Sequence, residues 1–331
     1  MGDRLGVAVV GTGSIGVGHL QALRALDGTE PVAVPVRPER IPELVGAGYA
    51  AERGLAQAVQ AHGVRLCIVA TETGRHVEDG IAAMDHQLDV LIEKPLAPSC
   101  AAAARLQTRA DATCRQVFVG CLLRFSTSLN TFRALLEQVG RLHAVRIDCR
   151  SYLPAWRPQR PYRDSYSARA EEGGVLRDLI HEIDYAGWLF GWPAVVQAQA
   201  ANAGRLGIGS DEIAEVTWVT AEGCVVSLGL DYLTRPPTRH MSAHGDRGTL
   251  DWDGLQGIVT LAVEGQPARQ ITCAETRQAL LIAQAQAFIQ AGRGALDPRL
   301  AGLSEGLRAL AVCDAAREAS ASGRRTPVRY P

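Results

Sequence analysis

Leu5-Gly-Val-Ala-Val-Val-Gly-Thr-Gly-Ser-Ile-Gly16 is the stretch that decides the fold of the N-terminal half. Its first six residues form an apolar run typical of a buried strand, and a helical pattern follows the last glycine. The glycines allow a tight turn, a close approach of a ligand to the backbone, and close packing of helix on strand. This order predicts a dinucleotide-binding turn made of Gly11, Thr12, Gly13, Ser14, Ile15 and Gly16, with the pyrophosphate on the helix N-terminus.

Strands and helices alternate after this turn. Further apolar runs at 31–36, 64–70, 90–92 and 116–120 are separated by helical patterns. The alternation predicts a Rossmann domain at 1–122, with a doubly wound parallel sheet. Ligands of such sheets bind beyond the carboxyl ends of the strands. Thr71, directly after the 64–70 run, is therefore expected to contact the ribose or nicotinamide side of the cofactor.

Leu91-Ile-Glu-Lys-Pro-Leu96 places a carboxylate and an ammonium at such a strand end. The proline lacks a backbone N–H, so the strand is expected to stop there. The pattern predicts that Glu93 and Lys94 lie in the ligand crevice. An ordinary charged strand end is the alternative that this stretch alone leaves open.

The tip of the second strand bears on the choice between NAD and NADP. An NAD-specific site usually has Asp or Glu about 20 residues past the glycines. Here the chain reads Val36-Arg-Pro-Glu-Arg40, with no acid at the tip. Arg37 is suited to a 2′-phosphate, which favours NADP. Stacking of Arg37 on adenine, or simple solvation, is the alternative.

The pattern changes after about residue 122. Successive strands are expected near 142–151, 194–201, 213–220, 224–232, 239–245, 249–253, 257–263 and 269–273. Strands in succession predict a second α/β domain at 123–331 with a large, mainly antiparallel sheet. A face of this sheet left uncovered would suit the formation of a homodimer or homotetramer.

Two segments of this second half carry candidate functional groups. Residues 156–169 hold four arginines among aromatic residues, which suits carboxylate or phosphate recognition. With Arg124, this segment gives the predicted substrate-binding residues Arg124, Tyr162, Arg163 and Arg169, and it predicts an anionic substrate. The alternative is a solvated loop.

The second segment is Gly173-Gly-Val-Leu-Arg-Asp-Leu-Ile-His-Glu-Ile-Asp-Tyr185. It predicts one helix with Asp178 and His181 on the same side. A carboxylate one turn from an imidazole fixes its tautomer and raises its pKa, as a general acid or base requires. A buried, satisfied histidine is the alternative reading.

Composition excludes several classes of function. The net charge of -1 and the 21% of charged residues give no electrostatic case for nucleic acid or a membrane surface. No apolar run approaches the roughly 20 residues needed to span a bilayer, and no signal peptide is expected. The eight cysteines are scattered, with no spacing typical of a metal site. These features favour a cytoplasmic protein without a bound metal.

The chain resembles the Gfo/Idh/MocA oxidoreductases, the family of glucose-fructose oxidoreductase and inositol dehydrogenase. The resemblance rests on the glycine turn, Glu93-Lys-Pro95, Arg124-Phe125, and Gly173-Gly-x-Leu-x-Asp178 with His181. It implies an NAD(P)-dependent dehydrogenase or reductase acting on a sugar or polyol. Lys94 and His181 would then lie beside the nicotinamide and the reacting carbinol. Asp178 precedes the histidine by three residues, whereas four is common in the family.

The predicted reaction is hydride transfer between nicotinamide and a secondary alcohol or ketone of a sugar derivative. His181 is the expected general acid/base, which also contacts substrate, Lys94 orients the reacting oxygen, and Asp178 orients His181. The resemblance also suggests a branch tied to surface-glycan or amino-sugar biosynthesis. Two alternatives stay open: a non-catalytic regulator that senses dinucleotide or sugar, and a reductase of a non-sugar carbonyl or imine, such as a linear tetrapyrrole.

Overall fold

The computed structural model describes residues 4–331, which divide into two compact units. The first unit contains the chain up to Leu122 together with Thr276–Leu307. The second contains Leu123–Glu275 and Arg308–Pro331. The sequence-based division after residue 122 therefore missed one feature, the return of residues 276–307 to the first unit.

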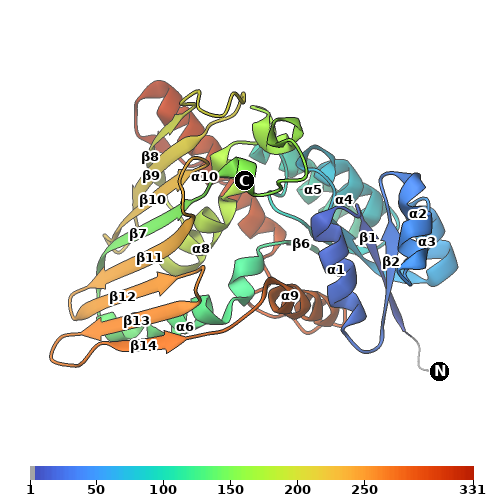
Figure 1. The fold of residues 1–331 in the computed structure, drawn as a ribbon, viewed down its shortest axis with the longest axis horizontal. Helices are drawn as coiled ribbons and strands as arrows, with labels where there is room; N and C mark the ends of the chain where they lie inside the picture. Colours follow the sequence, from blue (N-terminus) through green and yellow to red (C-terminus); the bar gives the residue numbers. More distant parts are fainter. Residues whose placement is uncertain (1–3) are drawn as a thin grey trace. The chain divides into compact units, whose positions relative to one another are not determined.

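The first unit is built on a six-stranded sheet in which every pairing is parallel (Figure 1). The strand order is β3-β2-β1-β4-β5-β6, and it reverses direction between β1 and β4. The predicted Rossmann sheet is thereby confirmed. The strands are β1 (Leu5–Val10), β2 (Thr29–Val34), β3 (Ala50–Ala51), β4 (Val64–Val69), β5 (Asp89–Ile92) and β6 (Val117–Val119).

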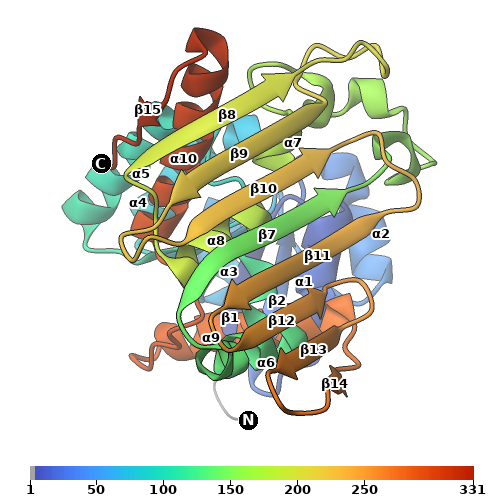
Figure 2. The ribbon, with the colours of Figure 1, turned by 90° about the vertical axis from the view of Figure 1, so that its left-hand side faces the viewer.

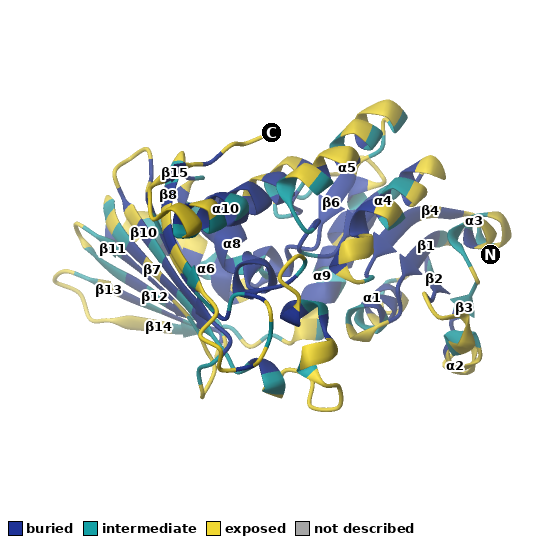
Figure 3. Cartoon of the chain, turned by 90° about the horizontal axis from the view of Figure 1, so that it is seen from above, coloured by how far each residue is buried: buried dark blue, intermediate teal, exposed yellow. Residues whose placement is uncertain are grey.

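Helices connect these strands, as parallel pairing requires. They are α1 (Ser14–Arg24), α2 (Ile41–Gly46), α3 (Leu55–His62), α4 (His76–Asp85) and α5 (Cys100–Thr113). Figure 3 shows the central strands β1 and β4 almost wholly buried, as their continuous apolar sequence predicts.

The returning segment begins with helix α9 (Arg277–Ala291), which packs against α1. A Cβ on Gly18 would lie 2.9 Å from a methyl carbon of Leu281, so the glycine permits the close approach of the two helices. Phe288 of α9 also meets Phe118 of β6 edge to face, with 5.9 Å between the ring centroids. These apolar contacts hold the segment in the first unit.

The second unit is built on a nine-stranded sheet of order β14-β13-β12-β11-β7-β10-β9-β8-β15. Its strand pairs are antiparallel except for β7 and β10, which confirms the predicted, mainly antiparallel sheet. The strands are β7 (Leu142–Arg150), β8 (Val195–Ala201), β9 (Ile213–Val219), β10 (Val225–Asp231), β11 (Thr238–Gly245), β12 (Gly248–Asp253), β13 (Ile258–Val263), β14 (Arg269–Thr272) and β15 (Thr326–Pro327).

Only one face of this sheet is covered by helices of the unit. Alternate residues of β7 and β9 are buried, which is the two-residue period of a strand with one covered face. Figures 1 and 2 show that α6 (Thr127–Leu135) and α8 (Ile180–Phe190) lie on the covered face of the nine-stranded sheet. Within residues 4–331, no helix of this unit lies over the other face.

The segment predicted as one helix after Gly174 is two helices. α7 (Val175–Asp178) ends at Leu179, whose backbone leaves the helical region with φ −96° and ψ 29°, and α8 begins at Ile180. Asp178 and His181 therefore belong to different helices, and the prediction of a single helical face was wrong.

No helix within residues 4–331 is both long and apolar enough to cross a bilayer.

Candidate functional site

The glycine turn has the geometry that a dinucleotide pyrophosphate requires. Gly11 has φ +88°, and a Cβ there would lie 2.7 Å from the carbonyl oxygen of Ala70. A Cβ on Gly16 would collide with the carbonyl oxygen of Gly11, whereas one on Gly13 would meet no atom within 4 Å. Gly11 and Gly16 are thus needed for the fold, while Gly13 borders open space.

The first backbone N–H groups of α1 lie beside this open space. Gly13 is the N-cap, and neither a capping side chain nor an acidic residue occupies the first turn among the residues described. Free N–H groups at a helix N-terminus attract an anion. The predicted residues from Gly11 to Gly16 therefore fit a bound pyrophosphate.

Arg40 is a neighbour of this turn that sequence reasoning missed. Its guanidinium donates to the carbonyl oxygen of Thr12 and lies 3.2 Å from the Thr12 hydroxyl. Glu43 holds the same guanidinium from the other side, through contacts of 2.6 and 3.0 Å. Arg37 is exposed in the same loop after β2. Arg37 and Arg40 thus both belong to the loop after β2, and Arg40 contacts the glycine turn.

Thr71 and His76 form part of the same sheet edge. The Thr71 hydroxyl donates to Asp79 Oδ2 at 2.8 Å. His76 is buried, with Nδ1 2.8 Å from the Pro95 carbonyl oxygen and Nε2 3.1 Å from the Thr71 carbonyl oxygen. Burial lowers the pKa of His76, outweighing the opposing effect of these two carbonyls. His76 thus links the loops after β4 and β5 and has a structural role.

Glu93 is tied to helix α1 by a buried contact. Its Oε1 atom lies 2.7 Å from Nε2 of His19, and the His19 side chain is 1% exposed. Burial raises the pKa of Glu93, but the hydrogen bond and charge of His19, with a contribution from Lys94, outweigh burial and lower it. Glu93 is therefore a carboxylate at neutral pH and accepts the Nε2–H of His19.

The second carboxylate oxygen of Glu93 fixes the next residue. The backbone N–H of Lys94 donates to Oε2 of Glu93 at 3.2 Å. Space for the carboxylate exists because residue 120 is glycine: a Cβ there would lie 3.0 Å from the Glu93 carboxyl group. Glu93 consequently acts as an anchor for Lys94 at the carboxyl end of β5.

Lys94 is the only lysine in a chain whose lysines and arginines together number 34. Its side chain is half-buried, between the buried residues Glu93 and Pro95. A lysine ammonium is a compact charge whose proton can be transferred, while an arginine guanidinium stays charged. Lys94 therefore has a compact charge and a transferable proton at the carboxyl end of β5, the sheet edge at which such folds bind ligands.

In the second unit, His181 is half-buried near the start of α8, and the six residues that follow it are buried. Asp178 is buried, and its Oδ2 atom accepts a 2.5 Å hydrogen bond from the hydroxyl of Tyr232. Burial, together with the charge of Asp178, raises the pKa of Tyr232 well above its usual value. Tyr232 is thus a permanent donor that sequence reasoning missed.

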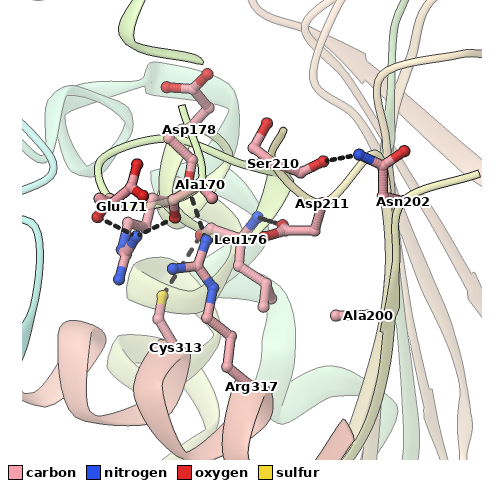
Figure 4. Close-up of polar contacts among 12 residues, drawn as sticks. Ala170, Glu171, Leu176, Asp178, Ala200, Asn202, Ser210, Asp211, Cys313 and Arg317 are labelled. Carbon is pink, nitrogen blue, oxygen red and sulfur yellow. Dashed lines mark hydrogen bonds and ion pairs between the residues drawn. The ribbon is translucent and has the colours of Figure 1, made fainter. Parts of the chain in front are cut away.

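The start of α7 is fixed by side chains from two other segments (Figure 4). Oδ2 of Asp211 accepts from the backbone N–H of Leu176 at 3.2 Å. Arg317 of α10 (Leu303–Ser322) donates to the other Asp211 oxygen at 2.8 Å and to the Gly173 carbonyl at 2.7 Å. Gly174 has φ +94° and no room for a Cβ beside the Asp211 carboxylate. These contacts fix the start of α7 and therefore the position of Asp178, its last residue.

Arg124, a predicted substrate-binding residue, has a buried protein partner. Its side chain is fully buried and forms a bidentate ion pair with Asp184 of α8, with contacts of 2.7 and 3.0 Å. A buried guanidinium requires such a partner. These contacts favour a structural role, in which Arg124 holds the helix that carries His181.

The other predicted substrate arginines also have protein partners. Arg163 Nε donates to the Leu206 carbonyl oxygen at 3.0 Å, and the Tyr162 hydroxyl donates to the same oxygen at 2.9 Å. Arg169 contacts both carboxylate oxygens of Glu172 at 3.1 Å. These contacts favour anchoring of the loop over substrate binding for Arg163 and Arg169.

Comparisons with known families cover both units. Residues 5–121 match the oxidoreductase family with an NAD-binding Rossmann fold, and residues 130–251 match the GFO/IDH/MocA C-terminal domain. The chain belongs to the Gfo/Idh/MocA oxidoreductase family, which confirms the resemblance inferred from its motifs.

Two of the similar proteins have the names of a polyol and a sugar dehydrogenase. The inositol 2-dehydrogenase of Streptomyces avermitilis is 31% identical over 199 residues, which cover 58% of this chain and 54% of that protein. The match thus spans about half the length of that relative. Levoglucosan dehydrogenase in complex with NADH has the same fold, with a TM-score of 0.88 and 18% identity over 99% of this chain and 100% of the other.

A third similar structure is the WlbA dehydrogenase from Bordetella pertussis in complex with NADH and UDP-GlcNAcA. It superimposes with a TM-score of 0.84 and 19% identity over 100% of this chain and 99% of that chain. At this level of identity the likeness concerns the fold.

Proposed function

We propose that the protein catalyses reversible hydride transfer between a nicotinamide cofactor and a secondary alcohol or ketone of a sugar-like substrate. The bound nicotinamide would supply or accept the hydride. Gly11 to Gly16 would hold the pyrophosphate on the N-terminus of α1. The observation that carries this proposal is the placement of the sole lysine at the carboxyl end of β5, the same sheet edge as the glycine turn.

Two side chains would handle the proton that accompanies the hydride. During oxidation, His181 would accept the hydroxyl proton of the carbinol as its carbon loses the hydride, and during reduction it would return that proton to the carbonyl oxygen. The Lys94 ammonium would donate a hydrogen bond to the same oxygen and stabilise its developing negative charge. Asp178 would position His181 and is in turn held by the Tyr232 hydroxyl.

Steady-state kinetics of Lys94→Ala and His181→Ala test this proposal. Proton transfer by a positioned side chain contributes roughly 10²–10⁴-fold, so kcat of His181→Ala should fall by that order. Loss of a hydrogen bond to the developing oxyanion costs about 10²–10³-fold, which is the fall expected for Lys94→Ala. Dinucleotide affinity, measured by calorimetry, should change little in His181→Ala. His143→Ala is the matched control, because His143 is exposed at the start of β7. Variants that turn over at the wild-type rate would contradict the assignment.

The substrate class is proposed from the relatives and tested by a screen. Inositol, levoglucosan and a UDP-linked sugar acid appear in the names of the similar proteins. A panel of polyols, sugars, sugar acids, nucleotide amino sugars of the surface-glycan type and linear tetrapyrroles should therefore be assayed for NAD(P)H turnover. Dinucleotide binding without turnover of any compound would favour a regulator.

We infer a preference for NADP over NAD from the loop after β2. Arg37 is exposed there, and Arg40 is held beside Thr12, and two guanidinium groups near the glycine turn support recognition of a 2′-phosphate. The ratio of the dissociation constants of NADP and NAD checks this directly. A lower constant for NAD would refute it.

We also propose that the uncovered face of the nine-stranded sheet joins copies of this chain in a homodimer or homotetramer. Val219 and Val225 pair across β9 and β10 on this face and are 50% and 37% exposed. Light scattering should give a mass of two or four chains, reduced by Val225→Glu, and a monomeric wild type would exclude the proposal.

All eight cysteines are free, which supports the cytoplasmic location expected from the sequence.

A further inference from the structure

Arg40, in the loop after β2, has a guanidinium group that two protein partners already share. Its Nη1 atom donates to the carbonyl oxygen of Thr12 and lies 3.2 Å from the Thr12 hydroxyl oxygen. Its Nε and Nη2 atoms donate to the two carboxylate oxygens of Glu43 at 3.0 and 2.6 Å. The edge formed by Nε and Nη2 is therefore filled by a bidentate carboxylate, in the arrangement that arginine also offers to a phosphate.

The contact with Thr12 holds Arg40 independently of Glu43. Thr12 is buried in the glycine turn, so its carbonyl oxygen is an acceptor with a fixed position. A guanidinium group held there keeps its place when another partner leaves, and little conformational freedom is lost when an anion binds to it. Arg40 is thus preorganised to bind an anion at the edge that Glu43 occupies.

The contact with Glu43 is, in contrast, easily replaced. The exposed fraction of the side chain is 25% for Arg40 and 64% for Glu43. The hydrogen bond from Arg40 lowers the pKa of Glu43, so this group is a carboxylate at neutral pH. Exposed ion pairs contribute little to stability, because solvent screens both charges. A phosphate monoester carries about two negative charges at neutral pH, so it can displace the single charge of the carboxylate.

Arg37 of the same loop has no such internal anion. It is exposed, and its side chain has no hydrogen-bond or ion-pair partner within residues 4–331. In dinucleotide-binding folds, an arginine near this strand end accommodates the 2′-phosphate of NADP. The loop therefore presents one guanidinium group that is available to a ligand and a second, Arg40, that carries its own counter-ion.

We propose that Glu43 is a specificity-determining residue, an internal anion that occupies the Nε and Nη2 edge of Arg40 until the 2′-phosphate of NADP takes its place. NAD lacks this phosphate and binds with the Arg40–Glu43 pair intact. NADP binds by displacing the carboxylate, which stays near a group of like charge and weakens the affinity for NADP. Glu43 thus limits the preference for NADP. This inference rests on the dinucleotide site of the proposed function and is independent of the hydride transfer.

Calorimetric titration of the full chain with NADP⁺ and with NAD⁺ tests the proposal. The key variant is Glu43→Gln, which removes the charge and one of the two acceptor oxygens. Glu39→Gln is the matched control, because Glu39 is exposed in the same loop and loses the same charge. Arg40→Gln and the double variant Arg40→Gln/Glu43→Gln complete a double-mutant cycle, which isolates the contribution of the pair.

Glu43→Gln should lower the Kd of NADP⁺ about three- to fivefold and leave that of NAD⁺ unchanged. Glu39→Gln should keep the wild-type ratio of the two constants, and Glu43→Gln should not alter the ratio in the Arg40→Gln background. The proposal is overturned if Glu43→Gln leaves the ratio unchanged, if Glu39→Gln changes it as much, or if the effect persists without Arg40. A wild type that shows these binding results but turns over no substrate overturns only the proposed reaction, and one that binds neither dinucleotide overturns both.

Discussion

Glu93→Gln is the substitution that most sharply probes how the reaction site is held. The carboxylate accepts two hydrogen bonds, from His19 Nε2 at 2.7 Å and from the backbone N–H of Lys94 at 3.2 Å. Glutamine has nearly the same shape but only one acceptor oxygen. With glutamine, His19 either faces the amide N–H or moves its proton to Nδ1, a buried atom without a hydrogen-bond partner among the residues described, so one buried donor is left unsatisfied.

The expected loss can be worked from this geometry. An unsatisfied buried donor costs about 1–3 kcal/mol. For a unit of roughly 150–250 residues, a loss of about 2 kcal/mol corresponds to a drop of about 4–8 °C in Tm. Because the Lys94 backbone loses its anchor, kcat should also fall, by about tenfold if the misplacement costs about 1.4 kcal/mol in the transition state.

The assay is thermal unfolding followed by calorimetry, together with steady-state kinetics. Glu78→Gln is the control, since the Glu78–Arg105 ion pair lies in the same unit with both side chains more than half exposed, and surface pairs contribute little. The lowered pKa of Glu93 adds a pH signature. A depressed carboxyl pKa stabilises the fold above the ordinary value of 4.5 and loses that effect as pH falls below it.

The Tm difference between wild type and Glu93→Gln should therefore narrow below about pH 4.5. If Glu93→Gln unfolds at the same temperature as Glu78→Gln and retains the wild-type kcat, Glu93 is not an anchor and the reasoning fails.

Three further predictions concern stability and cofactor choice. Asp184→Asn leaves Arg124 buried without its counter-charge, so calorimetry should show a loss of about 3–5 kcal/mol, and a loss below 1 kcal/mol would contradict the structural role. Gly13→Ala should leave Tm unchanged, because its methyl group meets no protein atom within 4 Å, yet weaken dinucleotide binding about tenfold in a calorimetric titration. The double substitution Arg37→Gln/Arg40→Gln should raise the Kd of NADP about tenfold while leaving that of NAD nearly unchanged, and equal effects on both would refute the 2′-phosphate contact.

The sequence predicts the framework of both units well, because each strand carries its own signal. The continuous apolar runs of β1 and β4 and the alternating pattern of β9 reflect burial on two faces or on one. The glycine turn is also a local signal, since its three glycines lie within one strand-turn-helix unit, although the atom that excludes a Cβ on Gly11 belongs to Ala70, after β4. The parallel pairing of the strands then follows from their alternation with helices.

Contacts between distant residues could not be predicted in this way. Spacing along a helix indicates only neighbours three or four residues apart. His19 and Glu93 are separated by 74 positions, and Arg124 and Asp184 by 60. Arg124 was predicted to bind substrate together with arginines of residues 156–169, because nothing in the sequence indicated its buried ion pair with Asp184.

Two local features were also beyond the sequence pattern. The apolar spacing from 175 to 183 fits a single helix, but the chain turns at Leu179 between α7 and α8. Nothing in the sequence indicates that α9 packs against α1 of the first unit. Both features depend on packing, which sequence periodicity does not describe.

The central claim is that Lys94 and His181 act together on the substrate of a bound dinucleotide. Because Lys94 is the only lysine, reductive methylation with ¹³C-formaldehyde labels just this side chain and the N-terminal amine, which serves as the internal reference. The account predicts that the Lys94 methyl resonance moves when NADP⁺ is added, and that His181→Ala changes it in the complex. A Lys94 resonance that responds to neither NADP⁺ nor His181→Ala would contradict the account.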